Sequence, residues 1–169
     1  MNKRLFLSLC GVPFLYACSS PAKYSAPSTT STPTPAPSSF PNNPAKRHDI
    51  VMQAIAMLDR GYTYGGKKMH TGFDCSGLVS FVYKESAGLS LRGTAAQMAN
   101  LTKPIAAEQA HPGDLVFFNT LGSSFSHVGI FIGEGKFIHA ANERTGVKSE
   151  RLSHAYWSKR FEGYRTFFA

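Results

Sequence analysis

The hydrophobic pattern of this chain changes character at Pro112-Gly113-Asp114. Before this tripeptide, apolar residues recur at helical spacing; after it, they form short runs typical of strands. A segment of helices followed by a segment of strands favours an α+β fold with an antiparallel sheet over an alternating architecture with a parallel sheet. With 169 residues, the chain has room for one domain of ordinary size plus appendages.

The helical part predicts three helices separated by glycine-rich segments. An apolar stripe predicts a helix over 46–60, and residues 61–74 are expected to form a loop. A second stripe predicts a helix that begins at Cys75 and stops at Gly88. Thr94 and Gln97 have capping-box spacing and predict a short helix to about residue 100. The stripe of the first helix comprises Ile50, Ala54, Met57 and Leu58, widened by Val51 and Ile55.

Strands are expected over 115–118, 128–132, 136–140 and about 164–168. The second and third form a hairpin. An odd-numbered loop, Gly133-Glu134-Gly135, places His127 and His139 on one face and leaves an aliphatic set on the other. A two-residue loop would instead place His127 on the aliphatic face, so the pattern favours the odd loop. The aliphatic set is Val128, Ile130, Ile132, Ile138 and Ala140.

The first 17 residues have the layout of an export signal. Lys3 and Arg4 precede an apolar stretch that is too short to span a bilayer, and Ala17 stands before Cys18. Leu15-Tyr16-Ala17-Cys18 resembles a bacterial lipobox, which implies cleavage before Cys18 and acylation of this cysteine. The alternative is an ordinary secretory signal with a chance cysteine.

A linker rich in Pro, Ser and Thr follows the anchor cysteine, so the expected organisation is signal 1–17, anchor and linker 18–45, and folded domain 46–169. No apolar run is long enough for a polytopic membrane protein. Resemblance to bacterial lipoproteins with Ser19 after the anchor implies the outer membrane, facing the periplasm, in a bacterium with two membranes.

The formal net charge is +8, or +6 after Lys3 and Arg4 leave with the signal. Such a charge suits an anionic polymer such as cell-wall glycan. The basic residues are scattered, however, and no aromatic-basic nucleic-acid motif occurs, so a solvated basic face without a nucleic-acid partner is expected.

Cys75 is the cysteine that remains after Cys10 leaves with the signal and Cys18 takes the lipid. The amino terminus of a helix favours a thiolate, so Cys75 is a candidate nucleophile with a lowered pKa. Asp74 is expected to cap this helix, and the backbone N–H groups around Cys75 and Ser76 to face a developing oxyanion. The alternative is a buried, inert cysteine.

A nucleophilic cysteine needs a base, and two of the six histidines lie on predicted strands. His127 opens its strand beside a flexible polar loop and is expected to be the base. His139 is expected to fix the tautomer and orientation of His127. Zinc held by Cys75, His127 and His139 is a weaker alternative, because the usual close ligand pair is absent; no metal or other cofactor is expected.

Five motifs in order resemble the NlpC-type cysteine peptidases, which are papain-like cell-wall hydrolases. The resemblance covers about residues 47–167. It implies nucleophile Cys75, base His127 and third catalytic residue His139, with Tyr62 reaching the active site and Asp74 and Ser76 beside the substrate. The motifs are Tyr62-Thr63-Tyr64-Gly65-Gly66, Gly72-Phe73-Asp74-Cys75-Ser76-Gly77-Leu78-Val79, Pro112-Gly113-Asp114-Leu115-Val116-Phe117-Phe118, His127-Val128-Gly129-Ile130-Phe131-Ile132-Gly133 and Phe137-Ile138-His139-Ala140.

The resemblance implies cleavage of peptidoglycan peptides next to D-glutamate or diaminopimelate through a thioester. An amidase or acyltransferase with the same triad is an alternative function, as is a non-catalytic wall-binding lipoprotein. The chain departs from the family at Leu91-Arg92-Gly93, where Leu-Pro-Arg is common. The loop that bounds the substrate groove is therefore expected to differ.

Overall fold

The computed structural model describes residues 41–168. The predicted signal sequence, Cys18 and most of the linker lie outside the described residues. The helices are α1 (Pro44–Ala56), α2 (Cys75–Ala87), α3 (Ala95–Asn100), the 3-10 helix η1 (Ala107–Gln109) and α4 (Ala155–Ser158). The strands are β1 (Lys67–Lys68), β2 (Gly72–Phe73), β3 (Lys103–Ile105), β4 (Leu115–Phe118), β5 (His127–Gly133), β6 (Lys136–Asn142), β7 (Gly146–Arg151) and β8 (Phe161–Thr166).

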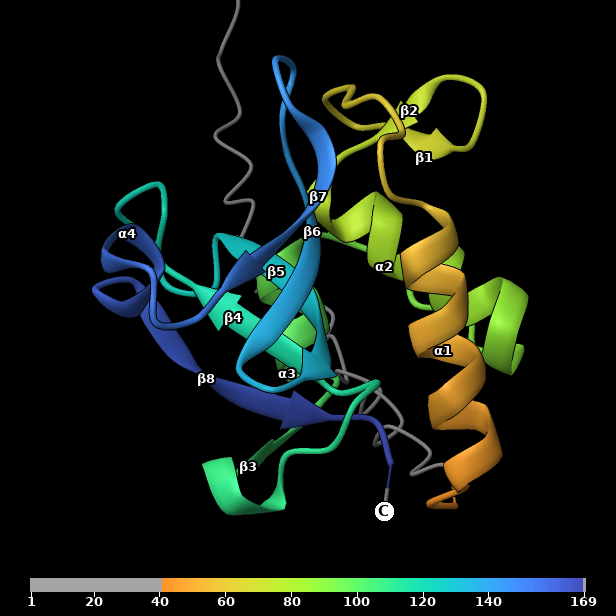
Figure 1. Cartoon of the computed structure of the whole chain (residues 1–169), viewed down its shortest axis with the longest axis vertical. Coiled ribbons are helices and arrows are strands. Elements are labelled where there is room, and N and C mark those ends of the chain that lie inside the picture. The colour runs from red at the N-terminus through yellow and green to blue at the C-terminus, as the bar shows by residue number, and fades with distance from the viewer. Residues whose placement is uncertain (1–40, 169) are drawn as a thin grey trace, which may run out of the picture. The chain divides into compact units, whose positions relative to one another are not determined.

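The expected α+β class is confirmed. Six strands form one sheet in the order β3-β8-β4-β5-β6-β7, and every neighbouring pair is antiparallel. Helices α1 and α2 lie on one side of this sheet and α4 on the other (Figure 1). Within residues 41–168, every helix is too short or too polar to cross a membrane.

Helix α1 is shifted toward the amino terminus relative to the expected 46–60. It begins at Pro44 because the side chain of Asn43 accepts hydrogen bonds from two backbone N–H groups of the first turn, and it ends at Ala56. Ile50, Ala54 and Met57 are buried as expected, but Ile55 is 42% exposed. The buried stripe is therefore narrower than the sequence indicates.

Helices α2 and α3 begin where the sequence predicts. Asp74 caps α2, and Gly88 ends it in the left-handed conformation that glycine adopts without strain (φ 73°). Both hydrogen bonds of the predicted capping box of α3 are present. The prediction of a loop over 61–74 is partly wrong, because this segment contains the small hairpin of β1 and β2.

The hairpin of β5 and β6 has the expected register but a different turn. Ile130 pairs with Ile138 and Phe131 with Phe137, which is the register of an odd loop. The tip nevertheless has two residues, Glu134 and Gly135, both with positive φ, as a tight hairpin turn requires. An irregularity between Phe131 and Gly133 restores the register.

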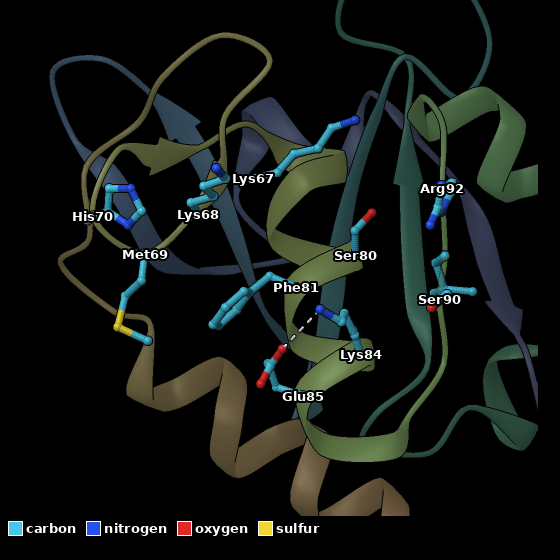
Figure 2. Close-up of a pocket in the computed structure, with 11 residues that line it drawn as sticks. Lys67, Lys68, Met69, His70, Ser80, Phe81, Lys84, Glu85, Ser90 and Arg92 are labelled. Atoms are coloured by element: carbon cyan, nitrogen blue, oxygen red, sulfur yellow. Dashed lines mark ion pairs between the residues drawn. The ribbon is translucent and has the colours of Figure 1, made fainter.

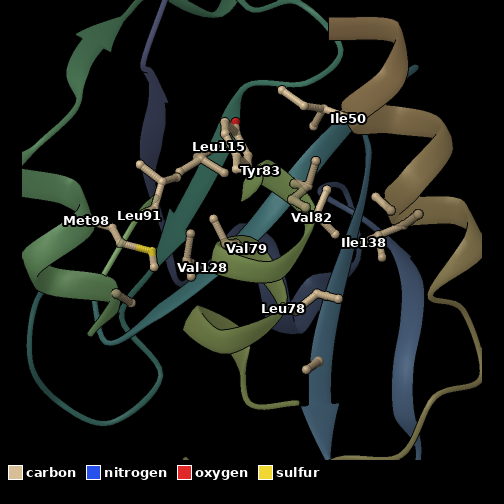
Figure 3. Packing of buried hydrophobic residues seen from close by; sticks show 14 of the residues in the cluster. Ile50, Leu78, Val79, Val82, Tyr83, Leu91, Met98, Leu115, Val128 and Ile138 are labelled. Atoms are coloured by element: carbon tan, nitrogen blue, oxygen red, sulfur yellow. The ribbon is translucent and has the colours of Figure 1, made fainter. Parts of the chain in front are cut away.

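The two sides of the sheet bury different sets of side chains. The predicted aliphatic set packs under α1 and α2, and Ile132 is the member that is only partly buried. Figure 3 shows Val79 and Val82 of α2 between Ile50 of α1 and the sheet residue Val128. On the other side, Trp157 of α4 packs on a mainly aromatic cluster. Both sides of the central strands are therefore buried from solvent. The buried members of that cluster are Val116, Phe118, Phe131, Phe137 and Trp157.

An ion pair ties α1 to the start of β4. The guanidinium of Arg47 donates to the carboxylate of Asp114 at 2.7 Å, and Asp114 is fully buried. The same carboxylate accepts from the hydroxyl of Thr166 and from the backbone N–H of His111. Arg47 also lies over the ring of Phe168, 4.2 Å from its centroid. These partners compensate the cost of burying the two charges.

Candidate active site

The first turn of α2 holds Cys75 in a fixed position. The Oδ1 atom of Asp74 accepts hydrogen bonds from the backbone N–H of Gly77 (2.6 Å) and the hydroxyl of Ser76 (3.0 Å). The backbone N–H of Asp74 donates to the carbonyl oxygen of Gly66 at 3.0 Å. Asp74 is thus the helix cap that the sequence predicts, and it also connects the helix to the segment that carries Tyr62.

Two glycines allow close backbone packing at the start of α2. A Cβ atom at Gly77 would overlap the carbonyl oxygen of Gly66, and one at Gly66 would lie 2.5 Å from the carbonyl oxygen of Gly72. Glycine is therefore required at position 77 for contact between the two backbones, and at position 66 for the close packing of the segment on itself. Tyr62, half-buried and paired with Phe73, is held beside Cys75 by the same packing.

The Cys75 thiol is half-buried, and burial raises its pKa to about 11. Hydrogen bonding from the backbone N–H groups of Val128, Ser76 and Cys75 itself opposes this shift, and the charge of Asp74 adds to it. The expected lowering of the pKa by the helix terminus is therefore wrong for the resting site. Desolvation of the sulfur outweighs the favourable N–H groups, so the resting sulfur is a neutral thiol.

His127 and His139 are in direct contact. The Nε2 atom of His127 lies 2.8 Å from the Nδ1 atom of His139, and both residues are buried. Burial lowers the pKa of His127 to about 4, although Asp74 opposes the shift. Burial also lowers the pKa of His139 well below its usual value, with His127 and Lys148 contributing. Both imidazoles are therefore neutral near pH 7.

Trp157 shields this histidine pair. Its ring stacks on His127 at an interplanar angle of 26° and meets His139 edge to face, with centroid distances of 5.5 Å and 4.7 Å. Sequence reasoning missed this residue. The signal was available, since Trp157 is the single tryptophan in the chain.

Cys75 and His127 open into the same cleft, which has a volume of about 830 Å³. The polar segment before β5 forms part of its wall and is held by Ser126, whose Oγ accepts from the backbone N–H groups of Thr120 (2.9 Å) and Leu121 (3.1 Å). His139 does not line the cleft and lies behind His127. The other predicted site residues that line the cleft are Tyr62, Asp74 and Ser76.

The structure therefore brings together every predicted site residue within 41–168, and Cys18 lies outside that range. In this part of the chain, no three His, Cys, Asp or Glu side chains are grouped to hold a metal ion. The zinc alternative consequently has no support from the geometry. Among the other histidines, His154 accepts a hydrogen bond from the backbone N–H of Tyr156 at the start of α4, and the His111 ring contacts the carbonyl oxygen of Gln109.

A helix that begins at a cysteine and packs on an antiparallel sheet, with a histidine pair on that sheet, is the arrangement of the papain-like class of fold. Residues 59–166 match the NlpC/P60 family, and the chain belongs to this family.

Relatives of known name share the domain. The chain is 38% identical over 114 residues to murein DD-endopeptidase MepH of Escherichia coli (strain K12), covering 66% of this chain and 42% of that protein. It is 36% identical over 119 residues to the gamma-DL-glutamyl hydrolase of Bacillus subtilis (strain 168), covering 70% of this chain and 29% of the relative. The chain therefore spans less than half the length of these two relatives.

A solved structure supports the same conclusion. A protein of Staphylococcus aureus subsp. aureus Mu50, described as similar to a lipoprotein of the NLP/P60 family, superposes with a TM-score of 0.66 at 32% identity. The superposition covers 80% of this chain and 45% of that protein. The family match over residues 59–166 includes every candidate site residue of the domain, and it confirms the resemblance seen in the motifs.

Proposed function

We propose that the protein is a cysteine endopeptidase that cleaves peptide stems or cross-links of peptidoglycan, with Cys75 as nucleophile, His127 as base and His139 as the third member of the triad. The observation that carries this proposal is the 2.8 Å contact between His127 Nε2 and His139 Nδ1 behind the cleft that Cys75 and His127 share. The names of the relatives supply the substrate class: one is a murein endopeptidase and the other a glutamyl hydrolase.

The histidine contact accommodates the tautomer that a base requires. When Nε2 of His127 carries its proton and donates it to Nδ1 of His139, the Nδ1 atom of His127 keeps a lone pair for the thiol proton. His139 then carries its own proton on Nε2, a buried atom without a hydrogen-bond partner among the described residues. His139 thus acts by orienting His127, the role of the third group in a triad.

The reaction begins from a neutral thiol and a neutral imidazole. As the Cys75 sulfur attacks the peptide carbonyl carbon, its proton passes to His127 and a C–S bond forms. Backbone N–H groups at Cys75 and Ser76 face the resulting oxyanion. The C–N bond breaks when His127 protonates the departing amine, which leaves a thioester. Water then gives a proton to His127 and attacks the thioester, releasing the carboxylic acid and restoring the thiol.

The neighbouring polar residues support the nucleophile. Asp74 fixes the first turn of α2 through Gly77 and Ser76, as its two hydrogen bonds indicate. Burial raises the pKa of Tyr62, and Cys75 and Asp74 add to this effect, so its hydroxyl stays protonated and can donate a hydrogen bond to substrate. In this proposal, Tyr62, Asp74 and Ser76 bound the part of the cleft nearest the nucleophile.

Mass spectrometry of fragments released from purified sacculi tests the proposal. We expect peptide fragments with new amino and carboxyl ends, and no release by Cys75→Ala, whose melting temperature should match that of the unmodified chain. Release that survives Cys75→Ala would remove this cysteine from the mechanism. Products with a transferred acyl group would favour an acyltransferase, and a chain that binds sacculi without releasing fragments would be a wall-binding protein.

We also propose that the protein is attached to the outer membrane through lipid on Cys18 and acts in the cell envelope. The lipobox-like Leu15-Tyr16-Ala17-Cys18 supports this, as does the likeness to a structure described as similar to a lipoprotein. Two or more acyl chains give lasting attachment. A linker of this composition reaches roughly 30 Å as a coil and roughly 80 Å when extended, which places the domain within reach of substrate away from the bilayer.

A further inference from the structure

A second cavity lies beside α2, next to the active-site cleft. Its volume is about 630 Å³, and its walls come from three places: the β1 segment with the loop that follows it, the exposed side of α2, and residues 90–92. Figure 2 shows Ser80 and Lys84 along α2, with Arg92 on the neighbouring segment and His70 on the loop. None of these side chains has a part in the proposed mechanism.

The lining of this cavity is strongly basic. The lining has four cationic side chains and a single carboxylate, that of Glu85; the cations are Lys67, Lys68, Lys84 and Arg92. Glu85 lies 3.7 Å from Lys84, and both side chains are largely exposed, so this ion pair neutralises little charge. Among residues 41–168, no ion pair involves the other three cations. Four of the basic side chains that are scattered along the sequence thus line one concave surface.

Apolar side chains lie among these cations. Met69, Phe81 and Leu91 line the cavity together with the charged residues. Phe81 is partly buried against the main core and Leu91 is 7% exposed, so core packing holds these two side chains, whereas Met69 is 42% exposed. An apolar surface bordered by cations suits a ligand with short aliphatic groups and free carboxylates. A peptide that contains alanine and acidic residues has this chemistry.

The cavity adjoins the active-site cleft. Lys67 lines both, and the neighbouring residues Arg92 and Gly93 line the cavity and the cleft, respectively. These two residues belong to the tripeptide at which the sequence departs from its family. Lys67 and Arg92 therefore lie where the cavity adjoins the cleft.

We propose that this cavity is an anion subsite, which holds free carboxylates of the wall peptide at a distance from the bond that Cys75 attacks. The inference rests on the proposed function for its substrate class. Lys84 and Arg92 are the specificity-determining residues in it. Because these side chains do not touch the reacting atoms, they contribute to substrate binding and leave the chemical step unchanged.

Binding to purified sacculi tests the subsite without cleavage. The full chain carrying Cys75→Ala serves as the parent, and the test variant adds Lys84→Gln and Arg92→Gln. A matched control adds Lys103→Gln and Lys159→Gln, which remove the same charge from exposed positions on β3 and after α4. Binding is measured by co-sedimentation with three preparations: untreated sacculi, sacculi stripped of phosphate polymers by acid, and sacculi whose carboxylates have been amidated.

We expect the test variant to bind untreated and phosphate-free sacculi about five- to tenfold more weakly than the control, since two exposed ion pairs are lost. On amidated sacculi, the two variants should bind equally. Equal binding of test and control variants to untreated sacculi would overturn the subsite. A difference that disappears after removal of phosphate would overturn the carboxylate assignment, since the ligand would then be a phosphate polymer.

Failure of the proposed function would be seen separately. The chain with Cys75 intact would then release no peptide fragments, whatever the binding of the variants. For the active chain with Lys84→Gln and Arg92→Gln, KM for a carboxylate-bearing stem peptide should rise while kcat stays within about twofold. An equal fall in kcat and kcat/KM would place these residues in the chemical step and contradict the subsite.

Discussion

His127 on β5 and His139 on β6 share a hydrogen bond of 2.8 Å between Nε2 and Nδ1, so the two strands hold the proposed base and its orienting group in fixed positions. The register of the hairpin makes this possible. The two rings lie diagonally across the ladder at Gly129, where the absence of a side chain leaves room; a Cβ atom there would lie 2.6 Å from the ring of Phe137.

The first prediction concerns the ranking of the two histidines. His127→Ala removes the base and should lower kcat/KM about 10³-fold or more, whereas His139→Ala removes only orientation and should lower it less. His139→Asn should recover part of the loss, because an amide oxygen accepts the same hydrogen bond. Steady-state kinetics on a soluble stem peptide measure all three variants. A larger loss in His139→Ala than in His127→Ala would reverse the assigned roles.

The second prediction concerns the pH dependence of activity. Burial lowers the pKa of His127 to about 4, so the base stays unprotonated far below pH 6.5. We expect kcat/KM to stay level from neutral pH down to about pH 5 and to fall with a midpoint near pH 4. A pH–rate profile measured with a soluble peptide checks this. A midpoint at or above pH 6.5 would show that His127 is solvated or paired with a thiolate.

The third prediction concerns the pH dependence of stability, and it also follows from the lowered pKa of His127. His127 has a lower pKa in the folded chain (about 4) than in the unfolded chain (6.5), so the unfolded state binds more protons between these values. The free energy of unfolding should therefore fall as pH drops from 6.5 to 4, by up to about 3 kcal/mol from this group. His139 contributes in the same direction.

Denaturant titrations over this pH range measure the effect. The control is His127→Gln, which removes the titrating ring and should show a shallower fall. Parallel curves for the two proteins would contradict a lowered pKa at His127.

The fourth prediction concerns Trp157 as a positioning residue. Trp157→Leu removes the ring that stacks on His127, so water should reach the imidazole and its pKa should rise toward 6.5. We expect the acid midpoint of kcat/KM to move upward and kcat to fall about tenfold, with KM nearly unchanged. Trp157→Phe, which keeps an aromatic ring, is the matched control. A lower melting temperature with an unmoved pH profile would indicate a role in packing alone.

The fifth prediction concerns Cys18. If this residue carries the lipid, Cys18→Ser should move the protein from the membrane fraction to the soluble fraction while its domain keeps full activity on sacculi. Cell fractionation followed by immunoblotting measures the distribution, with Cys10→Ser as the control that should change nothing. A Cys18→Ser protein that stays with membranes would refute the lipid anchor.

Much of the fold follows from local sequence signals. The starts of α2 and α3 were predictable because Asp74 and Thr94 provide cap side chains at defined spacing. The face of the sheet that carries His127 and His139 followed from the aliphatic pattern alone. The turn itself did not, because an irregularity near Ile132 and a two-residue tip give the same register as a three-residue loop.

Other features depend on tertiary context. Strands β3 and β7 form the two edges of the sheet. Both contain many polar residues, so their apolar and polar residues do not alternate regularly enough to predict a strand. Trp157 reaches the histidines from a helix of four residues that only the fold brings close. The direction of the Cys75 pKa shift depends on how deeply the thiol is buried, which local sequence does not reveal.

The contact between Gly66 and Gly77 has a consequence for how such a protein diversifies. A side chain at position 77 would push the segment that carries Tyr62 away from Cys75. The wall of the cleft formed by this segment therefore tolerates little variation at the contact. New preferences are more readily reached at residues 90–93, which line the cavity and the cleft. Laboratory evolution toward other wall chemistries should start with libraries at residues 90–93.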